Sequence, residues 1–196
     1  MRDEEKIKIF SKELNLIKEE SVRKFTEAAL QVLPEYFWQV PASATGKYHP
    51  QFDAGEGGLV RHTRATVAMA IQMFRNKNVF PIAEREQAYT ISALLLHDGC
   101  KNGLREDAVS TISEHPACVV TFLRDKHPEV LGMLTGEEQE AITGAILSHM
   151  GQWNTDYGTG AVILPEPVTN LQKLVALCDF IVSRRFIEVN LEATGY

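Results

Sequence analysis

The chain contains the stretch ISALLLHDGCK, residues 91–101, in which a His-Asp pair directly follows a run of apolar residues. The pattern of residues 84–98 predicts a helix, and its apolar run is expected to lie in the core. An ionised aspartate at the end of such a run costs free energy unless a metal ion or another cation compensates its charge. His97 and Asp98 are therefore the first candidate functional residues.

The sequence on either side of this stretch divides into further helices, with few signals for strands. Apolar residues recur every three or four positions within residues 4–33, which predicts one amphipathic helix or two in tandem. Further helices are expected near residues 58–76, 113–126, 137–150 and 168–187, and residues 161–164 could form a short strand. We expect an all-α fold in which residues 1–44 form an N-terminal helical extension and residues 45–196 form the main domain.

Composition limits the environment and the partners of the protein. Its 196 residues are 44% hydrophobic, which is enough for one buried core. The formal net charge of −6 gives no general attraction for nucleic-acid phosphates, so extended nucleic acid is an unfavoured partner. No apolar run approaches the roughly 18 residues that cross a bilayer. The charged N-terminus and three widely spaced cysteines favour a cytoplasmic protein with reduced thiols and no membrane contact.

Four histidines and two aspartates lie in apolar helices or at their ends. Singly, each has an ordinary explanation: Asp98 could cap a turn, and Asp179 could pair with Arg184 or Arg185. Explaining all six in this way is harder, because imidazole and carboxylate groups are together the ligand set of Zn, Fe and Mn. Helical bundles build such sites from inward-facing side chains on separate helices. The six candidate metal ligands are His62, His97, Asp98, His115, His149 and Asp179.

The order of these residues resembles the HD-domain superfamily of metal-dependent phosphohydrolases. That family has a His, a His-Asp pair and a distant Asp, with two further His in members that hold two metals. The segments that resemble its motifs are GGLVRHT (57–63), LLLHDGCK (94–101), SEHPACVVTFL (113–123), ILSHMGQW (146–153) and LVALCDFIVSRR (174–185). The most similar type is the HD domain of bacterial 3′–5′ exoribonucleases. Those proteins also carry an OB-fold module, whereas the first 44 residues here are expected to be helical.

The resemblance implies an HD-domain helical bundle that hydrolyses a phosphoester, as a phosphodiesterase does, by a metal-activated hydroxide. The implied substrate is a nucleotide or a similar small phosphorylated compound. Two divalent transition metal ions (Mn, Fe, Co, Ni or Zn) about 3.5–4 Å apart would clamp the attacking and leaving oxygens. The first would be held by His62, His97, Asp98 and Asp179, and the second by Asp98, His115 and His149. Asp98 and Lys101 are the expected catalytic residues.

Lys101 keeps the spacing of the family's lysine from Asp98, although Cys100 rather than a glycine precedes it. Its ammonium could neutralise charge on a phosphate oxygen, and the alternative is a solvated surface lysine. Two other functions fit the same ligands. Some HD-fold proteins with this set hold two irons and use oxygen to cleave a C–C or C–P bond. A metal site can also serve a regulatory domain that does not catalyse.

The loop of residues 41–58 is rich in Gly, Pro and small polar residues, and long loops in compact domains are often functional. His49 within it is expected to be exposed, with substrate contact as the alternative. One of Arg61 and Arg64, which flank His62, could reach the substrate. The N-terminal helix is expected to pack on its own domain, and an oligomer interface with another chain is the alternative.

Overall fold

The computed structural model describes residues 1–47, 49–105 and 107–195, and over these residues the fold is all-α, as the sequence predicts. No helix among them is both long enough and apolar enough to cross a membrane. The α-helices are α1 (Asp3–Ile9), α2 (Ser11–Leu14), α3 (Glu20–Val32), α4 (Gly58–Arg75), α5 (Glu84–Leu96), α6 (His115–Lys126), α7 (Pro128–Leu131), α8 (Gly136–Ser148) and α9 (Asn170–Val182). Short 3-10 turns are η1 (Glu35–Trp38), η2 (Gln51–Asp53) and η3 (Leu191–Ala193).

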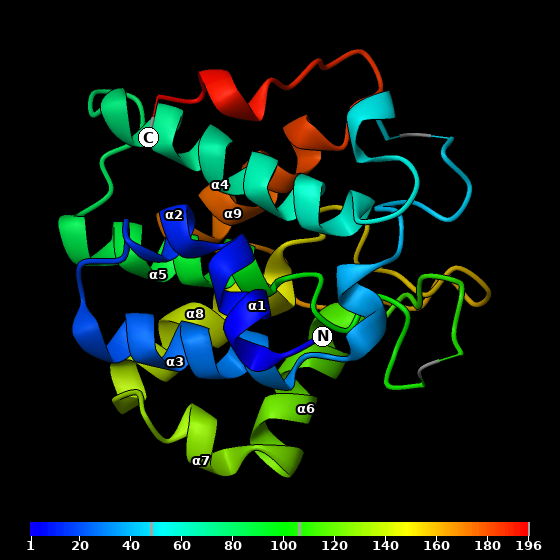
Figure 1. Cartoon of the computed structure of the whole chain (residues 1–196), viewed down its shortest axis with the longest axis horizontal. Coiled ribbons are helices and arrows are strands. Elements are labelled where there is room, and N and C mark those ends of the chain that lie inside the picture. The colour runs from blue at the N-terminus through cyan, green and yellow to red at the C-terminus, as the bar shows by residue number, and fades with distance from the viewer. Residues whose placement is uncertain (48, 106, 196) are drawn as a thin grey trace.

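Helix α5 forms the centre of the bundle. Every residue from Ala88 to Leu96 is buried, because the sequence is apolar or uncharged around the whole circumference of the helix. Helices α3, α4, α8 and α9 all pack against α5, and Figure 1 shows it crossing the molecule between α4 and α3. The helix ends at Leu96, so His97 and Asp98 lie just beyond its last turn, deep in the molecule.

Residues 4–33 form three helices rather than one or two. The first break lies at Phe10, whose fully buried ring packs against the rings of Phe37 and Trp38 at centroid distances of 6.4 and 5.7 Å. The apolar faces of α1–α3 belong to the same buried cluster as α4, α5, α8 and α9. This N-terminal segment therefore packs on its own chain. The boundary between residues 44 and 45 stays a prediction.

Two expectations near the C-terminus were wrong. Helix α9 ends at Val182 instead of residue 187. Just after this end, Ser183 Oγ and Arg184 Nε both donate to the carbonyl of Phe180. Such side-chain hydrogen bonds compete with continuation of the helix. Residues 161–164 form no strand, and only one isolated bridge joins Thr155 to Val162.

The side chain of Tyr36 ties the N-terminal segment to the loop that follows the His-Asp pair. Its buried hydroxyl donates to the carbonyl of Gly103 at 2.7 Å and accepts from the backbone N–H of Asn102 at 3.1 Å. These two bonds fix the turn that carries Lys101, because that turn lies directly before Asn102.

We predict that Tyr36→Phe lowers the free energy of unfolding by about 1–3 kcal/mol, since a buried donor and a buried acceptor both lose their partner. Urea denaturation of the variant and the wild type measures this change. Tyr157→Phe is the control, because Tyr157 is 69% exposed and its loss should stay within about 0.5 kcal/mol. Equal stabilities for the two variants would show that Tyr36 does not hold this turn.

Candidate metal centre

The structure brings all six predicted ligands together from five different segments. His62 lies on α4, His97 and Asp98 follow α5, and Asp179 lies on α9. His115 is the first residue of α6, and His149 is the residue that ends α8. Their ligand atoms form three overlapping groups, each with all atoms within 4.8 Å of one another. The groups are His62 with His97 and Asp98, His97 with His149 and Asp179, and Asp98 with His115 and His149.

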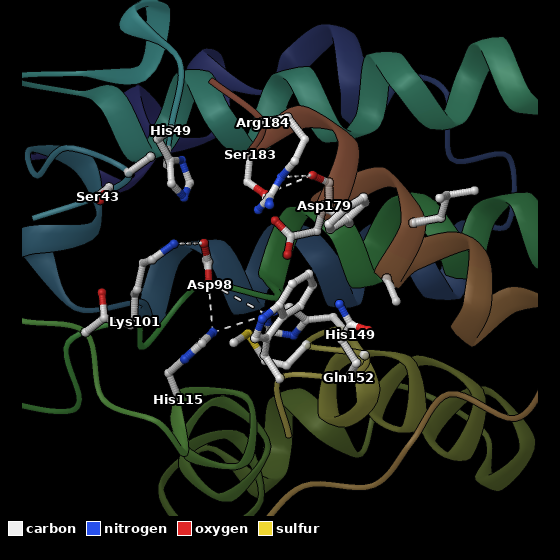
Figure 2. Close-up of a pocket in the computed structure, with 18 of the residues that line it drawn as sticks. Ser43, His49, Asp98, Lys101, His115, His149, Gln152, Asp179, Ser183 and Arg184 are labelled. Carbon is white, nitrogen blue, oxygen red and sulfur yellow. Dashed lines mark hydrogen bonds and ion pairs between the residues drawn. The ribbon is translucent and has the colours of Figure 1, made fainter. Parts of the chain in front are cut away.

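Asp98 lies between two sets of imidazoles. Its Oδ1 is 3.1 Å from His115 Nε2 and 3.8 Å from His149 Nε2. Its Oδ2 faces the other pair, at 3.5 Å from His97 Nε2 and 3.9 Å from His62 Nε2. Figure 2 shows Asp98 between Asp179 on one side and His115 on the other. One carboxylate thus presents a separate oxygen to each of two candidate metal positions.

Asp179 completes the first of these sets. Its Oδ1 lies 3.0 Å from His62 Nε2 and 3.7 Å from His97 Nε2. It therefore contacts histidines rather than the arginines that follow it on the chain. Burial raises the pKa of Asp179, but the hydrogen bond from His62 and the nearby His97 outweigh burial and hold the pKa well below its usual range. The side chain is an ionised carboxylate, which is the form that binds a metal ion.

Three of the histidines are held in the same tautomer by the backbone. In each, Nδ1 hydrogen-bonds a carbonyl oxygen three residues earlier, and since a carbonyl only accepts, Nδ1 carries the proton. A neutral ring then directs the lone pair of Nε2 toward Asp98 and its neighbours. The pairs are His97 with Leu94 at 2.7 Å, His115 with Ile112 at 2.9 Å and His149 with Ile146 at 2.7 Å.

These lone pairs face one another in a buried space. The Nε2 atoms of His115 and His149 are only 3.1 Å apart, and His97 Nε2 is buried without a hydrogen-bond partner in the described part of the chain. Burial and the neighbouring His97 and His115 lower the pKa of His149 to about 3, so His149 itself stays neutral. Two inward-facing lone pairs repel unless a cation lies between them. The donor set therefore fits divalent transition metal ions.

Lys101 is part of this centre and not a solvated surface lysine. Its Nζ lies 2.5 Å from Asp98 Oδ2, and the residue is 9% exposed. Burial raises the pKa of Asp98, but the charge of Lys101 and the neighbouring His97 and His115 outweigh it, leaving the pKa well below its usual range. Backbone turns from Gly99 to Leu96 and from Lys101 to Asp98 set this position. A side chain at Gly99 would collide with Leu33, so glycine fits there.

A cavity of about 860 Å³ opens from the centre to the surface. Asp98, Asp179, His115 and His149 line it on one side, together with Lys101. On another side the rings of Trp153 and Phe180 stack at 5.3 Å with an angle of 19° between them. The guanidinium of Arg184 lies 4.4 Å from the centroid of the Phe180 ring. Cavities of this size hold small molecules.

Other expectations for the site were wrong. Neither Arg61 nor Arg64 reaches the cavity: Arg61 donates to backbone carbonyls of residues 52, 54 and 56, and Arg64 pairs with Glu13 at 2.9 Å. His49 lines the cavity and is 15% exposed at its side chain, so it is not the exposed loop residue that the sequence favoured.

The sequence also gave no reason to single out Trp153, Phe180 or Asp53. Trp153 and Phe180 do lie next to the motifs of His149 and Asp179, so adjacency was the available signal. Asp53, in the long loop, lies 3.5 Å from His62 Nδ1. No spacing rule connects a loop residue to a helix residue in this way.

No protein-family model matches the chain, and neither does any curated protein or solved structure.

We predict that His115→Ala and His149→Ala each lower the bound metal from about two ions per chain to about one. Either change removes a ligand from one side of Asp98 and leaves His62, His97 and Asp179 in place. Elemental analysis after loading with Mn²⁺ and desalting measures the ratio. His127→Ala is the matched control, since His127 contacts Phe122 and Glu129 and belongs to none of the groups. An unchanged ratio in both site variants would show a mononuclear site.

Proposed function

We propose that this protein is a metal-dependent phosphohydrolase that cleaves a phosphoester in a nucleotide or a similar small phosphorylated compound. The observation that carries the proposal is the position of Asp98, which turns one carboxylate oxygen toward His115 and His149 and the other toward His62 and His97. Two-metal phosphoryl-transfer sites need such a shared carboxylate, because their ions lie only about 3.5–4 Å apart.

The residues of the chain divide the work between them. Bound divalent cations would supply Lewis acidity, polarising a phosphoryl oxygen and lowering the pKa of water. The tautomers fixed by Leu94, Ile112 and Ile146 keep Nε2 of three histidines ready to bind without reorganisation. Lys101 holds a positive charge at the edge of the cavity, beside Asp98, where it can offset charge on a phosphate oxygen.

The aromatic side of the cavity supports a nucleotide as the substrate. Trp153 and Phe180 present stacked rings beside the candidate metal positions, and flat ring systems such as nucleobases pack well on such surfaces. Arg184 adds a positive charge on the same wall. A ligand that spans from this wall to Asp98 would have an aromatic ring at one end and a phosphate at the other.

We predict that Asp98→Ala abolishes turnover and releases metal, because Asp98 would contact both ions. Bis(p-nitrophenyl) phosphate and a panel of nucleotides serve as substrates, with Mn²⁺, Co²⁺, Ni²⁺ and Zn²⁺ each added in turn. Asp107→Ala is the control, since Asp107 pairs with Arg105 in an exposed loop and belongs to none of the candidate metal groups. Normal metal content and activity in Asp98→Ala would refute the proposal.

Metal analysis, an optical spectrum and oxygen-consumption assays of the protein purified without oxygen distinguish the alternative functions. Tightly bound iron with oxo-bridged absorption and consumption of oxygen would replace the hydrolase with an oxygen-using enzyme. Metal binding without turnover of any compound tested would instead indicate a regulatory domain.

We also predict that small phosphorylated compounds exceed long single-stranded RNA in kcat/KM by about tenfold or more at physiological salt. The net charge of −6 opposes binding of an extended polyanion, and the rings of Trp153 and Phe180 line the cavity. Steady-state assays on a mononucleotide, a dinucleotide and a long oligoribonucleotide make the comparison. Processive degradation of the long strand would contradict this prediction.

A further inference from the structure

His62 differs from the other three histidines of the centre. Their Nδ1 atoms donate to backbone carbonyls. Nδ1 of His62, in contrast, is buried and has no hydrogen-bond partner among the described residues. The atom that faces it is Asp53 Oδ2, at 3.5 Å. The orientation of the His62 ring therefore depends on a side chain from the loop of residues 41–58.

Asp53 faces a second histidine as well. Its Oδ2 is 2.9 Å from Nδ1 of His49, and the residue is completely buried. A carboxylate only accepts hydrogen bonds, so His49 donates to Asp53 through Nδ1, and Nδ1 of His62 faces the same oxygen at 3.5 Å.

The loop that carries Asp53 is fastened to the helix that carries His62. Arg61, the neighbour of His62, donates to the carbonyls of Phe52 at 2.6 Å, Ala54 at 2.7 Å and Glu56 at 2.9 Å. At the start of the same helix, a side chain on Gly58 would come within 1.9 Å of the Asp53 carbonyl oxygen. These contacts set Asp53 behind His62 and leave it little freedom to move.

The ring of His49 contacts Asp53 and also lines the cavity. Because Nδ1 points to Asp53, Nε2 lies on the other side of the ring, and the residue is part of the cavity lining. Figure 2 shows the ring extending from its loop toward Lys101 and Asp98. No described residue accepts from or donates to Nε2 of His49.

We propose that Asp53 is a positioning residue that orients the rings of two histidines at once. It holds His62 with Nε2 toward Asp98 and Asp179, and it holds His49 with Nε2 presented to the cavity as a hydrogen-bond acceptor. This inference rests on the proposed metal centre and adds to it a carboxylate that contacts a ligand without itself binding the metal. Such carboxylates raise the basicity of a ligating histidine and fix its ring, and their loss typically weakens metal binding about 10–100-fold.

The first test measures Mn²⁺ binding by calorimetry in Asp53→Asn and Asp53→Ala. Both variants should raise the Kd about 10–100-fold, with the fold verified by circular dichroism. Glu13→Gln is the matched control, because Glu13 is a completely buried carboxylate that belongs to none of the metal-binding groups. Its Kd for Mn²⁺ should stay within about twofold of the wild-type value, because metal binding is expected to weaken only when a group that contacts a ligand is lost. Folded Asp53 variants with a wild-type Kd would overturn the proposal.

The second test needs neither metal nor turnover. Long-range ¹H–¹⁵N spectra of the metal-free wild type should show His49 protonated at Nδ1 and bare at Nε2, with the signal assigned by His49→Gln. The opposite tautomer would overturn the proposal, even where an Asp53 variant fails to fold. Failure of the hydrolase proposal looks different: no phosphoester is turned over, while Asp53 variants still bind Mn²⁺ weakly and His49 keeps its tautomer.

Discussion

The buried carboxylate of Asp98 is the constraint on which the rest of the centre depends. Removing an ionised group from water costs several kcal/mol unless nearby charges repay it, and Asp98 is only 3% exposed. Asp53 and Asp179 are also held ionised. The cations beside these three carboxylates are Lys101 and His62. Burial lowers the pKa of His62, but the neighbouring Asp179 and Asp53 outweigh it and raise the pKa to about 9. The metal-free centre therefore carries an excess of negative charge, surrounded by nitrogen lone pairs. A site with this balance favours divalent cations over protons.

The ends of two helices also fix the tautomers of two candidate ligands. The last carbonyls of a helix lack intrahelical partners, and Leu94 and Ile146 lie in the last turns of α5 and α8. Nδ1 of His97 and His149 donates to those two carbonyls. One hydrogen bond thus joins a carbonyl near the end of a helix to a candidate ligand and fixes the tautomer of that ligand. The apolar surface of α5, buried over its last nine residues, holds the first of these helix ends rigidly against four neighbouring helices.

Local apolar periodicity predicted the all-α fold. The gathering of six side chains was predicted from their ligand chemistry and from the resemblance of their order to a metal-binding family. The roles of Arg61 and Arg64 were not predictable in this way, since each depends on which distant segment packs beside α4. Asp53 was missed for the same reason: its partner His62 is reached through a loop whose path is set by Arg61 and Gly58. Helix periodicity places Phe10 on the apolar face, but it does not show that the first helix divides there.

The charge of the centre also bears on the order of binding in the proposed reaction. A phosphorylated ligand is an anion, and in the metal-free protein it would meet the excess negative charge of Asp53, Asp98 and Asp179. Among the described residues that line the cavity, the basic side chains are Lys101, Lys173 and Arg184, and Lys101 is already paired with Asp98. Cations bound between the histidines would reverse the sign of the field at the floor of the cavity. They would also compete with Lys101 for Asp98 Oδ2 and release its ammonium toward the ligand. In the proposed reaction metal binding would therefore precede substrate binding, and the same ions that would drive the chemistry would create the site for the phosphate.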